Sequence, residues 1–225
     1  MVGQLNEIYR QRYWAKFKDW CHEAVVRGYR LMLENPSDFK QWKEEKISAR
    51  LLREMRKDEF LVTKNISVAR EHELEDTEII YGEREASEAD RIDFSFESTW
   101  QQKEYIIYFG EAKNLSANSW DKESGSAVKA WDQREYYLKT GIQGLLIGKY
   151  QRLEGFLIGY IVNGSAKQNS ENLNKHIEKR RANDGINLLE IQEPTYNYDY
   201  FYFSKNIVDQ KQIDILHIFL EFDNS

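Results

Sequence analysis

The spacing of apolar residues predicts helices in four parts of the chain. From about residue 5 to residue 33, apolar side chains recur every three or four positions, as in an amphipathic helix. Pro36 ends this pattern, because proline cannot continue a helix. Ser37 or Asp38 is then placed to cap a second helix that runs to about Asp58. Two further helices are predicted over residues 126–138, with Gly141 as the stop, and over residues 171–181.

Shorter apolar runs in the rest of the chain predict strands. They cover residues 59–66, 77–81, 90–97, 104–110, 145–147, 156–162, 186–192, 198–204 and 213–221. Because strands and helices are interleaved, the chain is predicted to adopt an α/β fold with a central mixed β-sheet flanked by helices. We expect residues 1–36 to form an N-terminal helical extension and residues 37–225 to form one domain.

The strands predicted over 90–97 and 104–110 bring acidic residues to one end. Glu111 and Lys113 follow an almost continuous apolar run and, two residues apart, point to the same face. Asp93 joins them if the two strands pair as a hairpin. Two carboxylates and an ammonium could hold a divalent cation beside an attacking water, as phosphodiester hydrolysis requires. Two plainer interpretations stay open: Asp93 lies on a solvated strand face, and Glu111 forms an ion pair with Lys113.

A third carboxylate is predicted from the second helix. On a helical wheel, Glu44 falls near the centre of the apolar arc, whereas Glu45 lies about 100° away. A carboxylate that faces a core is costly unless it is paired or bound to a cation. Glu44 is therefore a candidate site residue, although an acid is also favoured at a helix N-terminus by the helix dipole and by water.

The helix predicted over 126–138 adds two polar side chains. Gln133 and Tyr137 are four residues apart and lie on one helix face. An amide and a phenol hydroxyl at this spacing could hold a phosphate or an ordered water. The alternative is that Gln133 makes surface hydrogen bonds and that Tyr137 belongs to the core.

In chain order, these residues resemble the PD-(D/E)XK nuclease superfamily, which has the restriction-endonuclease-like fold. The resemblance covers roughly Glu44 to Val162 and includes an uncharacterised bacterial branch found near defence loci. It departs from the name motif at Ile92, which stands where proline would precede Asp93. The resemblance implies an αβββαβ core and a bound Mg²⁺, for which Mn²⁺ would substitute. The implied site comprises Asp93, Glu111 and the Ala112 carbonyl as metal ligands, Lys113 as the cation that orients water, Glu44 as the helix acid, and Gln133 and Tyr137 in support.

Composition narrows the functional classes. The net charge of −6 argues against a non-specific coat on nucleic acid, but it leaves room for local basic patches. The single cysteine, Cys21, excludes an intrachain disulfide and a cysteine zinc site. No apolar run approaches the ~20 residues of a membrane span, and the N-terminus lacks a signal-peptide core. We therefore expect a cytoplasmic protein that does not enter membranes.

The leading hypothesis is a Mg²⁺-dependent deoxyribonuclease, with phage defence or restriction as its candidate setting. We expect Lys113 to lie at a solvated strand end, so that Lys113→Ala removes cleavage without disturbing the fold. The main alternative is a catalytically inactive nuclease-fold module that binds nucleic acid or a partner protein in a larger complex. A third is a structural subunit whose aromatic C-terminal strands form an interface. Homodimerisation and a partner subunit of a defence system are both left open.

Overall fold

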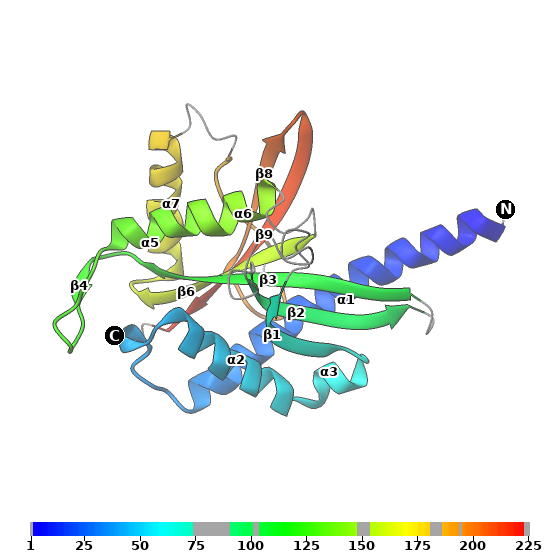
Figure 1. The fold of residues 1–225 in the computed structure, drawn as a ribbon, viewed down its shortest axis with the longest axis horizontal. Coiled ribbons are helices and arrows are strands. Elements are labelled where there is room, and N and C mark those ends of the chain that lie inside the picture. Colours follow the sequence, from blue (N-terminus) through cyan, green and yellow to red (C-terminus); the bar gives the residue numbers. More distant parts are fainter. Residues whose placement is uncertain are drawn as a thin grey trace, which may run out of the picture.

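A mixed β-sheet with helices on both faces organises the chain (Figure 1). The computed structural model describes residues 2–73, 91–100, 104–147, 154–180, 186–193 and 195–222. Seven strands lie in the sheet in the order β1-β2-β3-β6-β9-β8-β7. The α/β class and the mixed central sheet predicted from the sequence are confirmed. The strand predicted over 77–81 lies outside the described residues.

The sheet is antiparallel at both sides and parallel in the middle. Strands β1 to β3 pair antiparallel, β3, β6 and β9 run parallel, and β9 to β7 are antiparallel again. A short separate hairpin, β4–β5, follows β3. The strands are β1 Ser67–Glu73, β2 Arg91–Trp100, β3 Glu104–Ser116, β4 Trp120–Asp121, β5 Ala127–Val128, β6 Gly155–Asn163, β7 Glu190–Ile191, β8 Phe201–Val208 and β9 Lys211–Glu221.

One helical layer precedes the sheet in the sequence. It consists of α1 Val2–Glu34, the 3₁₀ turn η1 Phe39–Gln41, α2 Glu44–Lys57 and α3 Glu59–Thr63. The amphipathic faces of α1 and α2 pack with β2, β3 and β6 in one core cluster, to which α1 contributes from Phe17 onward. The first turns of α1 extend beyond the sheet (Figure 1).

The second helical layer covers the opposite face of the sheet. It consists of α5 Ala130–Tyr136, the π-helical segment η3 Tyr137–Ile142, α6 Gln143–Leu146 and α7 Ala166–Arg180. Its apolar side chains pack with Phe109, Leu115, Leu157 and Phe219 of the sheet in a second core cluster. The sheet is therefore covered on both faces, which explains why its central strands are almost continuously apolar.

Several local predictions are wrong where short apolar runs carry no clear period. Strands were predicted over 59–66 and 145–147, but residues 59–63 form helix α3 and residues 143–146 form helix α6. Helix α2 begins at Glu44, because the backbone is still extended at Trp42 and Lys43. Gly141 does not end its helix: η3 runs through it into α6. A Cβ at Gly141 would lie 3.3 Å from Leu157 Cδ2, so glycine lets this helix approach the sheet closely.

Candidate active site

The candidate site forms where β2 and β3 part. Their pairing runs from the Trp100–Glu104 pair to the Phe94–Gly110 pair. Asp93, the residue next to Phe94 on β2, lies just beyond the last pair. Beyond this point, the Asp93 carboxylate accepts a hydrogen bond of 2.8 Å from the Ala112 backbone N–H. Strand β3 continues alone beside β6 as far as Ser116. Because the two strands separate here, the Asp93 side chain occupies the place of a backbone partner and lies next to Glu111.

Oxygen atoms from three segments surround the Lys113 ammonium. Lys113 Nζ lies 2.6 Å from Glu111 Oε1, 3.1 Å from Glu44 Oε1 and 3.7 Å from Asp93 Oδ2. It also donates to the Ala112 carbonyl at 2.7 Å. The structure therefore brings together Glu44, Asp93, Glu111, Ala112 and Lys113, which are five of the seven residues singled out from the sequence.

Glu44 reaches this cluster from the first turn of α2. Its Oε1 accepts from Lys113, and its Oε2 accepts from the Asn114 backbone N–H at 3.1 Å. Glu45, the next residue along the helix, is exposed. The helical wheel thus predicted the orientation of α2 correctly. Because Glu44 contacts two residues of β3, it also fixes the end of α2 against the sheet.

Lys113 does not lie at a solvated strand end, so that expectation is wrong. Its residue exposure is 4%, because Glu44 closes over it from α2 and the Tyr136 ring from α5 lies 5.4 Å from Nζ. A buried ammonium depends on its anionic partners, and removing one member of a buried ion cluster is costly. Lys113 must therefore contribute to stability as well as to any chemistry of the site.

The carboxyl groups share one electrostatic environment. Burial raises the pKa of Glu44 and of Glu111 to about 7, against the opposing effect of the Lys113 charge. Burial also raises the pKa of Asp93. For Lys113, burial acts to lower the pKa, but Glu111, Glu44 and Asp93 outweigh it and the pKa is raised. Lys113 therefore remains a cation at neutral pH, and the carboxylates carry more negative charge than one ammonium neutralises.

The donor set at this place fits a hard divalent cation. It consists of oxygen atoms only, from the carboxylates of Asp93 and Glu111 and the Ala112 carbonyl, and Mg²⁺ prefers such ligands. Glu111 Oε2 is buried and has no hydrogen-bond partner within the described part of the chain, which leaves one carboxylate oxygen available to ligate. Within the described residues, no group of three or more His, Cys, Asp or Glu side chains is arranged to hold a metal ion. The carboxylates converge on the Lys113 ammonium instead.

The structure separates Gln133 from Tyr137. Gln133 lines a small pocket beside Glu44, and its buried Oε1 atom has no partner among the residues that the structure describes. The Tyr137 hydroxyl instead reaches across the sheet to His217 Nδ1 on β9, at 2.8 Å, within the second core cluster. Burial lowers the pKa of His217 to about 3, so this pair is neutral. Tyr136, three residues after Gln133, is the tyrosine that lines the pocket.

Sequence reasoning missed three residues near the cluster. Arg70 on β1 lies close enough to lower the pKa of Asp93, and it donates to the Glu45 carbonyl at 2.6 Å. Asn114 offers its backbone N–H to Glu44, and Tyr136 covers Lys113. The alternation of β3 gave no signal for Asn114, because its role depends on a helix from another part of the chain. Arg70 could have been suspected as the cation on the strand that precedes Asp93.

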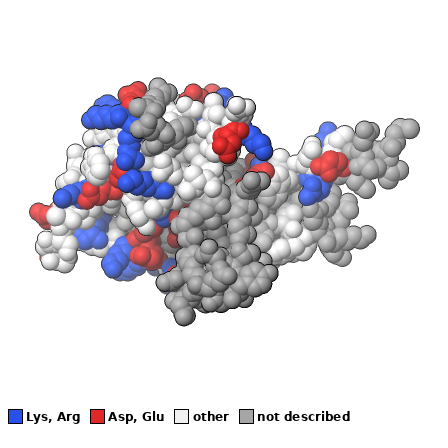
Figure 2. Space-filling model, turned by 45° about the horizontal axis from the view of Figure 1, so that its top comes forward, with Lys and Arg blue, Asp and Glu red and all other residues white. Residues whose placement is uncertain are grey.

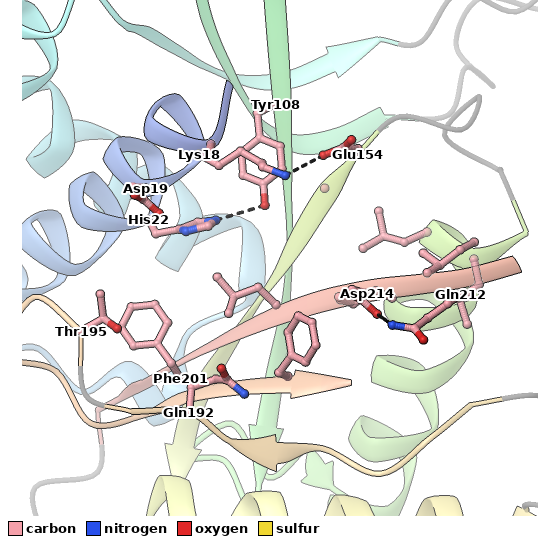
Figure 3. Close-up of a pocket in the computed structure, with 18 of the residues that line it drawn as sticks. Lys18, Asp19, His22, Tyr108, Glu154, Gln192, Thr195, Phe201, Gln212 and Asp214 are labelled. Atoms are coloured by element: carbon pink, nitrogen blue, oxygen red, sulfur yellow. Dashed lines mark hydrogen bonds and ion pairs between the residues drawn. The ribbon is translucent and has the colours of Figure 1, made fainter. Parts of the chain in front are cut away.

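A larger cavity, of about 1190 Å³, lies apart from this cluster, between α1 and the β8–β9 hairpin (Figure 3). Three pairs of its polar side chains are drawn in Figure 3, namely Lys18 with Glu154, His22 with Tyr108, and Gln212 with Asp214. Among the described residues, none of the buried side-chain N or O atoms that lack a hydrogen-bond partner belongs to a residue lining this cavity, whereas Glu111 in the cluster around Lys113 has one.

Charge on the molecular surface is mixed. On the coloured part of the face in Figure 2, Lys and Arg side chains lie next to Asp and Glu side chains. This pattern agrees with the net charge of −6 and with the sequence-based argument against a non-specific nucleic-acid coat. In the described part of the chain, none of the helices has the length and apolar character needed to cross a membrane.

In comparisons with family models, with curated proteins and with solved structures, no match to this chain is found. The geometry and chemistry of the site therefore provide the basis for assigning a function.

Proposed function

We propose that the protein is a Mg²⁺-dependent nuclease that hydrolyses phosphodiester bonds in DNA. The observation that carries this proposal is the convergence of Glu44, Asp93, Glu111 and the Ala112 carbonyl on Lys113, at the point where β2 and β3 separate. An ion pair that only stabilised the fold would need one carboxylate for one ammonium. Three carboxylates leave excess negative charge, which a divalent cation would neutralise.

The chain order supports a restriction-endonuclease-like core. A helix that carries one acid (α2) is followed by β1, β2, β3, helix α5 and a strand parallel to β3, namely β6. Apart from the short elements α3, β4, β5, η3 and α6 that lie between them, this order is compatible with the αβββαβ core that the sequence resemblance implies. Asp93 lies on β2 and Glu111 on β3, as the proposal requires.

Each residue has a role that follows from its contacts. Asp93, Glu111 and the Ala112 carbonyl would hold Mg²⁺, which when bound supplies positive charge to the scissile phosphate. Lys113 adds a second positive charge at the same place and, because it stays protonated, acts as a cation rather than as a base. Glu44 orients Lys113 and offers a carboxylate oxygen to a water. Hydrolysis consumes one water: its oxygen bonds to phosphorus, the bond to one sugar oxygen breaks, and that oxygen takes up a proton.

The test is cleavage of labelled DNA by wild type and by single-site variants, in EDTA, in Mg²⁺ and in Mn²⁺. Asp93→Asn and Glu111→Gln keep the shape of the site and remove a ligand charge, so we expect the cleavage rate to fall by roughly 10²-fold or more. Glu45→Gln is the matched control, because Glu45 is exposed and adjacent to Glu44 on the same helix. It should cleave like wild type.

Mn²⁺ binding, measured from the electron paramagnetic resonance signal of the free ion, provides a second readout. Wild type and Glu45→Gln should bind Mn²⁺, and Asp93→Asn should not. DNA binding in EDTA without cleavage in either metal, together with no Mn²⁺ binding, would contradict the nuclease proposal. That result would favour the alternative, an inactive module of the same fold that binds nucleic acid or a partner.

A further inference from the structure

A small pocket adjoins the candidate site. Its volume is about 260 Å³, and the segment around η1, the β4–β5 hairpin and helix α5 form its walls. Among the residues that line it are Trp42, Glu44, Asn114, Trp120, Gln133 and Tyr136. Glu44 and Tyr136 also contact Lys113, so a group in this pocket would lie directly beside the proposed reaction centre.

The pocket contains polar atoms that the protein itself leaves unpaired. Asn114 Oδ1, Gln133 Oε1 and Trp120 Nε1 are buried and have no hydrogen-bond partner among the described residues. Such atoms destabilise the folded protein unless something satisfies them. The three residues that carry them come from separate elements and line one pocket, and the atoms comprise two acceptors and one donor. The edge of a nucleobase presents both donors and acceptors of this kind.

Aromatic rings form much of the pocket wall. Trp42 packs edge-on against the buried Phe39, with ring centroids 5.0 Å apart, so its orientation is fixed from behind. Trp120 is half-buried, and Tyr136 is 54% exposed. A largely exposed tyrosine beside a buried ion cluster gains little from burial, but it offers a face on which a planar ring can stack.

The charged side chains around the pocket suit a nucleotide, which combines a neutral base with a negatively charged phosphate. The half-buried Glu44 lines the pocket, which disfavours a phosphate beside it, whereas a nucleobase is neutral. Lysines lie nearby: the exposed Lys43 and the half-buried Lys122 also line the pocket, and Lys46 Nζ lies 4.0 Å from the Trp42 ring centroid. A DNA strand with one base in the pocket would therefore place its phosphate backbone near ammonium groups.

On these grounds we infer that this pocket binds one unstacked nucleobase, so that the preferred substrate is single-stranded DNA. The pocket volume is below that of a typical drug-sized site, which suits a single base rather than a segment of duplex. A base within a duplex is stacked and paired, and it could enter only after being extruded. The inference rests on the proposed function for the identity of the polymer and deepens it by naming the substrate class.

The experiment measures binding without cleavage, by fluorescence anisotropy in EDTA. The probes are a labelled single-stranded DNA oligonucleotide of mixed sequence and the duplex of the same sequence. Wild type should bind the single strand more tightly. Tyr136→Ala and Gln133→Ala should each weaken single-strand binding, by roughly tenfold for Tyr136 because it loses a stacked base. Trp131→Ala is the matched control: Trp131 is also on α5 and 55% exposed, but it packs on His176 instead of lining the pocket. Its single-strand affinity should equal that of wild type.

Trp120→Phe provides a second variant that keeps a ring and removes the unpaired N–H. Because that N–H has no partner among the described residues, its loss breaks no internal hydrogen bond; single-strand affinity should fall, whereas the melting temperature should fall only by the packing that the smaller ring loses. Equal binding of single strand and duplex, no binding of either probe, or equal losses in Tyr136→Ala and Trp131→Ala would overturn the inference. Selective single-strand binding with no cleavage in Mg²⁺ would retain the pocket and refute the nuclease. Cleavage of the duplex at a rate that Tyr136→Ala does not change would retain the nuclease and refute the base-binding pocket.

Discussion

Replacing Lys113 by methionine should destabilise the protein strongly when no divalent cation is present. Methionine keeps the length of the side chain and removes its charge. The change leaves the carboxylates of Glu44, Asp93 and Glu111 without the ammonium that lies within 3.7 Å of each of them. Because Lys113 is only 4% exposed, water cannot replace it fully.

The size of the effect follows from burial. Breaking a buried ion cluster by removing one partner costs about 3–5 kcal/mol. For a chain of this length, each kcal/mol lowers the melting temperature by about 2–4 °C, so a fall of roughly 6–20 °C is expected. Lys139→Met is the matched control, since the Lys139 side chain is 57% exposed and forms an i,i+4 pair with Glu135. Exposed pairs are worth ~0–1 kcal/mol.

Thermal melts at two pH values, with and without Mg²⁺, test whether repulsion between the carboxylates causes the loss of stability. Near pH 8 in EDTA, Glu44 and Glu111 are ionised and the loss should be greatest, whereas near pH 5 protonation of these carboxyls should reduce it. Excess Mg²⁺ should raise the melting temperature of Lys113→Met more than that of wild type. The reason is that in the variant Mg²⁺ would supply the positive charge that the carboxylates have lost, whereas in wild type the ammonium already neutralises part of their charge.

Two results would refute this reasoning. If Lys113→Met melts at the wild-type temperature in EDTA at pH 8, the ammonium does not hold the carboxylates together. If the variant is destabilised but Mg²⁺ does not restore it, the cluster is a structural ion network, and the proposed metal site loses its physical basis.

Three further predictions concern single residues. Asp93→Asn should raise the melting temperature modestly in EDTA, because burial raises the pKa of Asp93 and neutralising it removes repulsion, and it should abolish the Mg²⁺-dependent rise seen in wild type. The pKa of Glu44 is about 7 in the folded protein against 4.5 for an ordinary glutamate, so its folded form binds the proton more tightly. The contribution of Glu44 to the free energy of unfolding in EDTA should therefore fall as pH rises from 4.5 to 7. Glu44→Gln should flatten this pH dependence and weaken Mn²⁺ binding. Glu45→Gln should change neither the pH dependence nor Mn²⁺ binding. Tyr137→Phe should lower stability by roughly 1–3 kcal/mol, since it leaves Nδ1 of the buried His217 without its partner, while Nε2 still pairs with Ser204. Mn²⁺ affinity should be unchanged; a large loss of it would place Tyr137 back in the site.

The features that depend on local periodicity could be predicted from the order of residues alone. Alternation within β2 and β3 indicated that Asp93, Glu111 and Lys113 share one place, and the helical wheel indicated that Glu44 faces the sheet; the structure brings all four together. These predictions succeed because side-chain direction repeats every 2 residues in a strand and every 3.6 in a helix, whatever the rest of the chain does. Short apolar runs such as residues 145–147 lack a full period, and there the prediction of a strand was wrong.

Only the tertiary structure decided what encloses the cluster. Lys113 is buried because α2 and α5, distant in sequence, close over the end of β3, and a strand pattern contains no information on that closure. Similarly, Gln133 and Tyr137 share a helix face, but the length of the tyrosine carries its hydroxyl to His217 on β9, while Tyr136 turns toward Lys113. The pocket between Trp42, Trp120 and Tyr136 joins three segments whose approach is set by packing on both faces of the sheet. Such contacts depend on non-local burial, which the order of residues specifies only through the complete fold.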